Sequence, residues 1–337
     1  MFDCSQDIRS YHDDAVKISD DTRRTLRENR NTNRDRLNDN LKEKEKPRPV
    51  RFQKQGSYAM RTTIQEENNA YDIDDGAIFL KEDLKGERDG EMSALQARQM
   101  VGEALKDKRF KKQPEVLKNC VRVYYDEGHH VDVPVYRRTG DNESNYTHEI
   151  ASSGWKGSSP ADINEWFDDQ IEKKKSDRDD DDPQMRRMIR LLKRYATSRG
   201  SWNLPSGFII TILLDEKYLA FDEREDRCFY YLIVAVKDRL HFSLTVKNLV
   251  QDEILTKGDP DPKMKALREK LEEAIDKLKV LFEHNCTRTK ALKAWADVFN
   301  TDYFDADIDA AESKSSFVVR GGQPSEPVHK AGGGRFG

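Results

Sequence analysis

Two aspartates separated by one residue, in the stretch YDIDDGAIF, have the spacing to bind a cation. The segment Asp72–Leu80 has the composition of a β-strand, and alternate side chains of a strand point to the same face. Asp72 and Asp74 would therefore share one face, while Asp75 would point away from both. Two carboxylates on one face repel each other, so the arrangement predicts a cation between them. The alternative is an ordinary acidic turn.

A third aspartate lies in a second strand-like stretch, HHVDVPVY, where Asp132 shares a face with His130 and opposes the valines. If this strand pairs beside the first, three carboxylates converge at one edge of a sheet. Mg²⁺ is typically held by such carboxylates together with substrate phosphates. Two ions about 3.5–4 Å apart can hold an attacking hydroxyl and a leaving pyrophosphate in line. We therefore predict a site for two Mg²⁺ ions, or Mn²⁺, with Asp72, Asp74 and Asp132 as ligands and catalytic residues.

A Gly56-Ser57 turn precedes the first aspartate by 14 intervening residues. Glycine lets a backbone approach phosphate closely, and a helix start after it offers N–H donors beside the serine hydroxyl. No GKS or GKT follows, so this is not a Walker loop. The turn, the paired aspartates and the strand-borne Asp132 together favour nucleotide chemistry.

The elements that must position these residues form a sheet with helices against it. A strand leads into the Gly-Ser turn, a helix with Ser93 as its N-cap follows the first acidic strand, and a turn joins two further strands. The predicted ranges are Val50–Gln55, Ser93–Phe110, Val121–Tyr125 and His130–Tyr136. Asp20–Leu41 could be a long solvated helix, or simply an exposed and weakly packed segment.

From residue 160 onward the apolar spacing becomes helical. Helices are expected over 161–174, 183–197, 206–221, 223–240, 262–283 and 287–299. We therefore predict an α+β protein that combines a mixed sheet and its flanking helices with a C-terminal helical lobe. The predicted divisions are an N-terminal helical and linker segment (1–49), a catalytic lobe (50–159), a helical lobe (160–308) and a disordered Gly-rich tail (309–337).

Composition limits the function classes without choosing one. The chain has 337 residues, 36% of them charged, and a net charge of −4, which gives no global preference for nucleic acid. No apolar run is long enough to span a membrane, and the N-terminus lacks the apolar core of a signal peptide. Four scattered cysteines form no CxxC pair, which argues against structural zinc. A cytoplasmic protein is expected.

These motifs resemble the polymerase-β-type nucleotidyltransferases, and within them the cGAS/DncV-like enzymes of bacterial cyclic-oligonucleotide anti-phage signalling (CBASS). The resemblance rests on QGSYAMRTTI, YDIDDGAIF and HHVDVPVY, on the stretch around Trp155–Phe167, and on the helices that follow. It covers residues 51–304.

The resemblance implies roles that spacing alone does not assign. Gly56 and Ser57 would hold the triphosphate, and Lys193 and Ser206 of the helical lobe would reach it across the cleft. From composition alone, Ser206 could be only an N-cap, and the basic face that carries Arg186, Arg190 and Lys193 would be solvated. The implied reaction joins ATP and other nucleoside triphosphates into a cyclic di- or trinucleotide second messenger and releases pyrophosphate.

Two other functions explain parts of the sequence. A polymerase-β-type enzyme acting on RNA or a small molecule would keep the same acids, and a non-catalytic nucleotide-binding scaffold would explain the charge-rich helices. The run DRDDDD at residues 177–182 reads as a solvated loop. Tyr71, Phe79 and Tyr136 could stack on bases or belong to the core.

The C-terminal stretch GGGRFG suggests partners. A flexible chain ending in Gly337 suits a ubiquitin-like conjugation enzyme, and the resemblance also implies regulation by a HORMA-domain protein. A downstream effector would bind the cyclic product. An unselected floppy end is the alternative for the tail.

Overall fold

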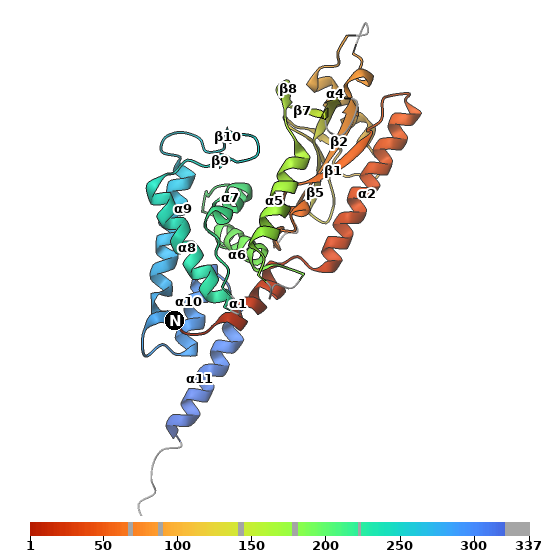
Figure 1. Cartoon of the computed structure of the whole chain (residues 1–337). Coiled ribbons are helices and arrows are strands. Elements are labelled where there is room, and N and C mark those ends of the chain that lie inside the picture. Colours follow the sequence, from red (N-terminus) through yellow and green to blue (C-terminus); the bar gives the residue numbers. More distant parts are fainter. Residues whose placement is uncertain (67–69, 87–89, 141–144, 177–180, 222–223, 321–337) are drawn as a thin grey trace, which may run out of the picture. The chain divides into compact units, whose positions relative to one another are not determined.

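The computed structural model describes residues 1–66, 70–86, 90–140, 145–176, 181–221 and 224–320 (Figure 1). The chain divides into two compact units. One spans Asp3–Asp276, and the other combines Met1–Phe2 with the chain from Lys277 onward. The candidate site lies entirely within the first unit.

An eight-stranded mixed sheet forms the centre of the first unit. Its strands are β1 (Arg51–Gln55), β2 (Asp72–Leu80), β3 (Glu115–Val116), β4 (Val121–Tyr124), β5 (His130–Val133), β6 (Val135–Thr139), β7 (Thr147–Ala151) and β8 (Trp155–Gly157). A separate two-stranded ribbon joins β9 (Lys247–Asn248) and β10 (Glu253–Ile254). The mixed sheet with its helices confirms the predicted fold class.

The helices agree with the predicted pattern and add several elements to it. They are α1 (Ser5–Tyr11), the π-helix η1 (His12–Val16), α2 (Asp20–Glu43), α3 (Gly56–Ala59), α4 (Ala94–Leu105), α5 (Pro160–Lys174), α6 (Gln184–Thr197), α7 (Gly207–Lys217), α8 (Glu225–Phe242), α9 (Pro262–Leu278), α10 (Arg288–Phe299) and α11 (Asp305–Arg320), with 3₁₀ turns η2 (Lys81–Asp83) and η5 (Lys279–Phe282). None of the helices in the described ranges combines the length and apolarity needed to cross a bilayer.

The predicted strand His130–Tyr136 is divided in two at Pro134, which has no N–H to donate to a sheet. Both pieces run parallel to β2 in one continuous register, which pairs Asp72 with His130, Asp74 with Asp132 and Ala77 with Val135. The Ala77 N–H donates to the Pro134 carbonyl at 2.8 Å, so the ladder continues across the interruption. The register therefore brings the acids of both strands together.

Helices α2 and α4 pack against each other and cover the apolar face of the sheet. Figure 1 shows α2, in orange-red, running alongside β1. Leu26, Leu37 and Leu41 of α2 are at most 1% exposed, so the alternative of a weakly packed segment is wrong. Ser93 begins α4 with a complete capping box, as its N-cap position predicted.

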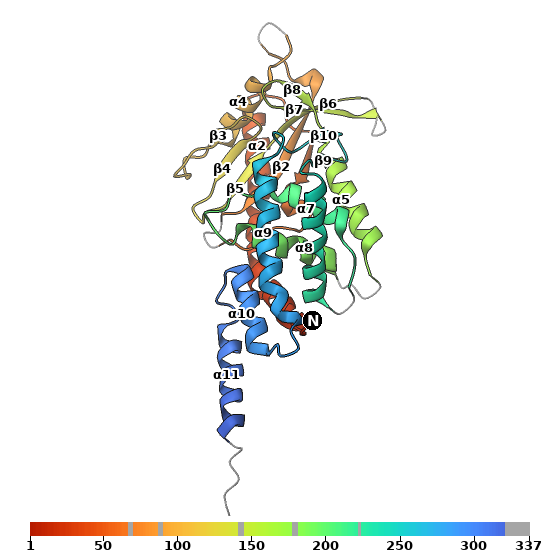
Figure 2. The ribbon, with the colours of Figure 1, turned by 90° about the vertical axis from the view of Figure 1, so that its left-hand side faces the viewer.

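Helices α6, α7 and α8 pack together in the same unit, and Figure 2 shows α7 beside α8. In α6 the apolar stripe is buried as expected. Three of its basic side chains are buried too, because each finds a hydrogen-bond acceptor inside the protein: Arg186, Arg190 and Lys193 are at most 9% exposed. The expectation that composition alone gave, a solvated basic face, is therefore wrong.

The second unit contains η5, α10 and α11. Thr287 caps α10 through a side-chain bond to the Lys290 N–H, and the rings of Trp295 and Phe299 stack at 5.9 Å. The sequence predicted a disordered tail from residue 309, but the chain is helical up to Arg320. The remaining tail, with Gly337, lies outside the described residues.

Candidate active site

A cavity of about 880 Å³ opens beside the edge of the sheet that carries the acids. Six of the seven predicted site residues line it: Gly56, Ser57, Asp72, Asp74, Lys193 and Ser206. The seventh, Asp132, is 7% exposed and pairs with Asp74 in the adjacent strand. The fold thus brings together residues from two strands, one turn and two helices that are far apart in the sequence.

The three aspartates form a concentration of negative charge. Burial, followed by the charges of Asp132 and Asp72, raises the pKa of Asp74 to about 6. Burial also opposes ionisation of Asp72, but contact with His130 and the charge of Arg122 outweigh burial and lower its pKa. The register and these shifts agree with the expected repulsion between neighbouring acids.

Asp75 points away from this site, as the strand alternation predicted. It is 2% exposed, and both its oxygens accept hydrogen bonds from Arg34 of α2, from Nε at 2.6 Å and from a terminal nitrogen at 2.5 Å. It therefore ties the long helix to the sheet.

Part of the compensating positive charge comes from the chain itself. Arg122 of β4 donates from Nε and from a terminal nitrogen to the two oxygens of Asp132, each at 2.7 Å, and lies 3.8 Å from Asp72. His130 contacts Asp72. Sequence reasoning missed Arg122, although the β4–β5 hairpin register sets it directly opposite Asp132.

The donor set still fits a divalent cation. One ligand atom each from Asp72, His130 and Asp132 lies within 4.8 Å of the others, and Asp74 is the register partner of Asp132. Carboxylate oxygens are the ligands that Mg²⁺ and Mn²⁺ prefer. The negative charge that these neighbouring carboxylates concentrate in one place favours the binding of an additional cation.

The Gly56-Ser57 turn lies directly against the acids. Gly56 has a φ of +65°, and a Cβ at this position would lie 2.3 Å from Oδ2 of Asp74. Only glycine allows this approach without displacing the carboxylate. Ser57 Oγ is 3.2 Å from Oγ1 of Thr63, and Gln55 presents a buried Nε2 without a partner among the described residues. The cavity therefore contains polar donors beside the acids.

Lys193 and Ser206 approach the cavity from α6 and α7. Nζ of Lys193 donates to the Thr62 carbonyl at 3.3 Å and to Oγ1 of Thr62 at 2.9 Å. Burial, and then the charge of Arg190, lower the Lys193 pKa to about 7. A Cβ at Gly207 would lie 2.9 Å from Cε of Lys193, so this glycine makes room for the lysine stem. Ser206 is the N-cap residue, but its side chain makes no cap bond.

Other predicted positions fall into two groups. Tyr71 and Tyr136 line the cavity, whereas Phe79 is fully buried in the core. Residues 177–180 of the acidic run lie outside the described part of the chain, and Asp182 at its end pairs with Arg190 instead of being solvated. The reading of the run as a solvated loop is therefore wrong for Asp182.

Comparison with known proteins agrees with this geometry. Residues 50–136 match the family model described as Cyclic GMP-AMP synthase DncV-like, nucleotidyltransferase domain. A curated cyclic GMP-AMP synthase of Escherichia albertii is 28% identical over 209 residues, which are 59% of this chain and 44% of that protein. The match thus spans less than half the length of that relative.

Solved structures of DncV share the fold. The Vibrio cholerae cyclic AMP-GMP synthase DncV superposes with a TM-score of 0.70 at 14% identity, covering 89% of this chain and 96% of that chain. Escherichia coli DncV in its 3′-deoxy GTP bound form gives 0.68 at 16% identity, with 87% and 94% covered. Residues 50–136 thus match a DncV-like nucleotidyltransferase domain, and the chain shares the fold of DncV over most of its length.

Proposed function

We propose that this protein joins nucleoside triphosphates into a cyclic di- or trinucleotide and releases pyrophosphate. One observation carries the proposal: the β2–β5 register sets Asp74 beside Asp132, directly against the Gly56 backbone, in a cavity that Lys193 and Ser206 also line. Acids, a close-approach turn and buried donors are the parts that nucleotidyl transfer requires. The Escherichia albertii relative is named for such a synthesis.

The reaction forms one phosphodiester bond at a time. The 3′ or 2′ hydroxyl oxygen of one nucleotide attacks the α-phosphorus of another, and the bond to pyrophosphate breaks. Asp132 would lower the barrier to deprotonating the attacking hydroxyl, whose proton passes to solvent. Repetition within the same cavity would close the ring. The cavity of about 880 Å³ lies near the upper end of the range for small-molecule binding sites.

The triphosphate would be held from both sides of the cavity. Ser57 and the backbone of the Gly56 turn would bind it on the sheet side, and Lys193 with Ser206 on the helical side. A phosphate near Lys193 would favour the charged form of an amine whose pKa burial lowers to about 7. Lys193 would then exchange its Thr62 contacts for phosphate oxygens.

The three carboxylates would hold two Mg²⁺ ions, or Mn²⁺, which would supply positive charge to the reacting phosphates. The close approach of Gly56 to Asp74 fits this assignment, because it brings the triphosphate turn to the carboxylates. Arg122 and His130 would orient the carboxylates that they contact.

The biological setting that we propose is anti-phage defence in the bacterial cytoplasm, where the cyclic product acts as a second messenger on an effector. Regulation would come from a HORMA-domain protein or from ubiquitin-like conjugation at Gly337. Conjugation can be tested in cells that carry the neighbouring genes. Detection of a covalent adduct that depends on Gly337 would support it.

Incubation of the purified chain with labelled ATP, GTP, CTP and UTP plus Mg²⁺ tests the reaction. We expect pyrophosphate release and a cyclic product identified by mass. The absence of any pyrophosphate release with the candidate activators present would contradict the proposal.

The matched control is a double variant in which both site aspartates of β2 are replaced, Asp72→Ala with Asp74→Ala. Product should disappear while the folded state is kept, because removing clustered like charges relieves repulsion. Circular dichroism and thermal unfolding measure the fold. Product from the double variant would show that other residues carry the reaction.

A further inference from the structure

Three buried cations of α6 reach three consecutive backbone carbonyls. Arg186 Nε donates to the Met60 carbonyl at 3.0 Å, Arg190 Nε to the Arg61 carbonyl at 3.1 Å, and Lys193 Nζ to the Thr62 carbonyl at 3.3 Å. Positions 186, 190 and 193 are four and three residues apart, so they lie on one face of the helix. Since these residues are at most 9% exposed, each buried N–H donor requires an acceptor.

The accepting segment is the end of the Gly-Ser turn. The short helix α3 begins at Gly56 and closes through bonds from the Met60 N–H to the Gly56 carbonyl and from the Thr62 N–H to the Ser57 carbonyl. Arg61 holds a left-handed φ of 56°, which costs energy for a residue other than glycine. Carbonyls at a helix end have no partner within the helix, and cations there are favourable. Helix α6 therefore fixes the turn from its far side.

Arg190 has the most partners of the three. Its terminal nitrogens donate to Nε2 of His12 at 2.6 Å and to Asp182, at 2.8 Å for the longer of the two bonds. His12 is fully buried and its Nδ1 contacts Asp13. His12, Asp13 and Asp182 lie as close together as metal ligands, but the guanidinium supplies the positive charge that such a cluster needs.

The N-terminal segment holds the same stretch from another direction. The Gln65 N–H donates to the Val16 carbonyl at 2.7 Å, and Lys17 forms an isolated bridge with Ile64. The π-helix that carries His12 ends at Val16. Arg190 therefore joins the N-terminal segment, the acidic run and the Gly-Ser turn in one network.

We propose that Arg190 is a positioning residue for triphosphate binding, and that His12 and Asp182 orient it. The inference rests on the proposed function, in which the Gly56-Ser57 turn holds the triphosphate. Arg190 does not line the cavity among the described residues, so it acts through the Arg61 carbonyl. A guanidinium can satisfy all three partners at once because its donors point in fixed, different directions, whereas an ammonium is a single point of charge.

The test replaces Arg190 by lysine, which keeps the charge and loses the planar fork. Binding of α,β-methylene-ATP and of AMP is measured by calorimetry in Mg²⁺ with the full-length protein. We expect the affinity for the triphosphate analogue to fall about tenfold, because misplaced binding groups are costly, while AMP affinity changes less than about twofold.

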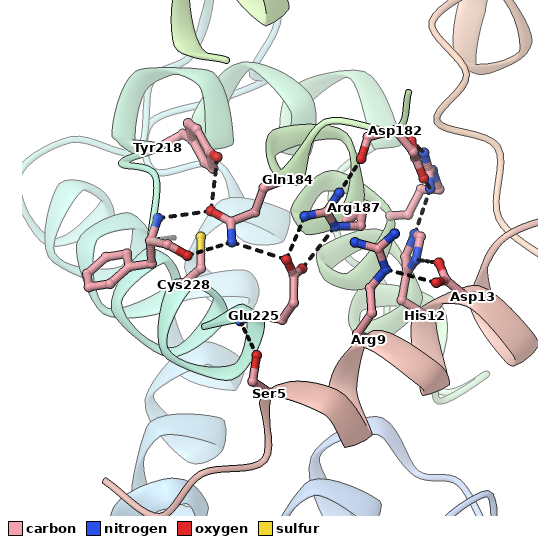
Figure 3. A network of polar contacts seen from close by, with 12 residues as sticks. Ser5, Arg9, His12, Asp13, Asp182, Gln184, Arg187, Tyr218, Glu225 and Cys228 are labelled. Carbon is pink, nitrogen blue, oxygen red and sulfur yellow. Dashed lines mark hydrogen bonds and ion pairs between the residues drawn. The ribbon is translucent and has the colours of Figure 1, made fainter. Parts of the chain in front are cut away.

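Arg187→Lys is the matched control. Arg187 lies on the same helix, is 5% exposed and pairs with Glu225, to which its terminal nitrogen donates at 2.6 Å; its other terminal nitrogen donates to the backbone carbonyl of Asp182. Figure 3 shows Arg187 directed to Glu225, while His12 lies beside Asp13. We expect both lysine variants to lower the free energy of unfolding similarly, but only Arg190→Lys to lose the preference for the triphosphate analogue over AMP.

His12→Asn provides a second route that leaves α6 intact. The substitution removes the His12 Nε2 atom, to which Arg190 donates. We expect the preference for the triphosphate analogue over AMP to fall by about twofold to fivefold, which is less than in Arg190→Lys. If Arg190→Lys and His12→Asn both keep the wild-type preference, or lose AMP and analogue affinity equally, the positioning role is wrong. If the wild-type protein itself shows no preference for the analogue and forms no product, the proposed function fails instead.

Discussion

At the scale of single residues, the acidic site carries a built-in counter-charge. The sequence predicted a cation beside Asp72 and Asp74, and the structure places the guanidinium of Arg122 at their edge, while the His130 ring contacts Asp72. Arg122 holds both oxygens of Asp132, so a divalent cation must share or displace this ion pair. Arg122 would therefore set part of the free energy with which a metal could bind.

Replacing Arg122 by glutamine tests this role. The variant removes the positive charge that offsets the three carboxylates. We therefore expect its melting temperature in EDTA to be lower than that of the wild type, and its melting temperature to rise more when Mn²⁺ is added. The difference in free energy should be on the order of 1–3 kcal/mol. Calorimetric titration of Mn²⁺ measures it without turnover. An unchanged response to Mn²⁺ would show that Arg122 does not compete with the metal.

Lys193 predicts a pH dependence of stability in the absence of nucleotide. Its pKa falls from 10.5 to about 7 on folding, so between these values the unfolded chain holds a proton that the folded chain lacks. Stability then rises with pH across this window, by up to about 1.4 kcal/mol per pH unit. Lys193→Met should lack this rise. Urea unfolding at pH 7, 8 and 9 compares the two, and parallel profiles would contradict the assignment.

The aspartates and the Gly-Ser turn could be picked out from the sequence because each is recognised from a short stretch of neighbouring residues. Alternation along a strand predicts that Asp74 and Asp75 point to opposite faces, and it did so correctly. The burial of Arg190 could not be predicted in this way, because two of its acceptors, Arg61 and His12, are more than a hundred residues away in sequence. Composition shows where charged residues are concentrated in the sequence, but tertiary contacts decide whether these residues are exposed to solvent.

At the scale of elements, the Gly-Ser turn is held between a strand on one side and a helix on the other. The acidic strand β2 lies so close that Asp74 fills the space of a Gly56 side chain. Helix α6 holds the other side through the carbonyls of residues 60–62. The turn is thus fixed between a strand and a helix before any nucleotide arrives.

Gly56→Ala tests the approach of turn and strand. The new Cβ would lie 2.3 Å from Asp74 at a left-handed φ, so backbone strain of about 1–2 kcal/mol and displacement of the carboxylate are expected. We expect a lower free energy of unfolding by this amount and loss of Mn²⁺ and nucleotide affinity, measured by urea unfolding and calorimetry.

Gly157→Ala in β8 is the control, because a Cβ there meets nothing within 4 Å. It should leave stability within about 0.5 kcal/mol and binding unchanged. Equal effects of the two substitutions would mean that the Gly56 contact is not special.

Most elements followed from periodicity, and the exceptions have physical causes. Pro134 divides one predicted strand, and η1 has no pattern that distinguishes a π-helix from an α-helix. Strands β7 and β8 were not predicted, since THEIA and WKG alternate too weakly to stand out. The register of β2 with β5, on which the site depends, is a long-range pairing that the sequence allowed but did not specify.

At the scale of the molecule, the site exists only where sheet and helices meet. The acids belong to β2 and β5, the turn to the β1–α3 junction, and Lys193 and Ser206 to α6 and α7. Neither group of elements alone presents all of these residues to the cavity. A nucleotide bound with Mg²⁺ should therefore link elements that are separated by more than a hundred residues.

Hydrogen exchange with α,β-methylene-ATP and Mg²⁺ tests this link. A nucleotide bound by both the sheet side and the helical side of the cavity should protect backbone amides on both sides. We therefore expect slower amide exchange at the end of β1, in α3 and at the start of α7 together. Asp74→Asn weakens cation binding in the sheet, and it should also remove protection from α7, which carries none of the acids. Exchange that changes at β1 and α3 but never at α7 would place the nucleotide on the sheet alone. Lys193 and Ser206 would then have no part in binding.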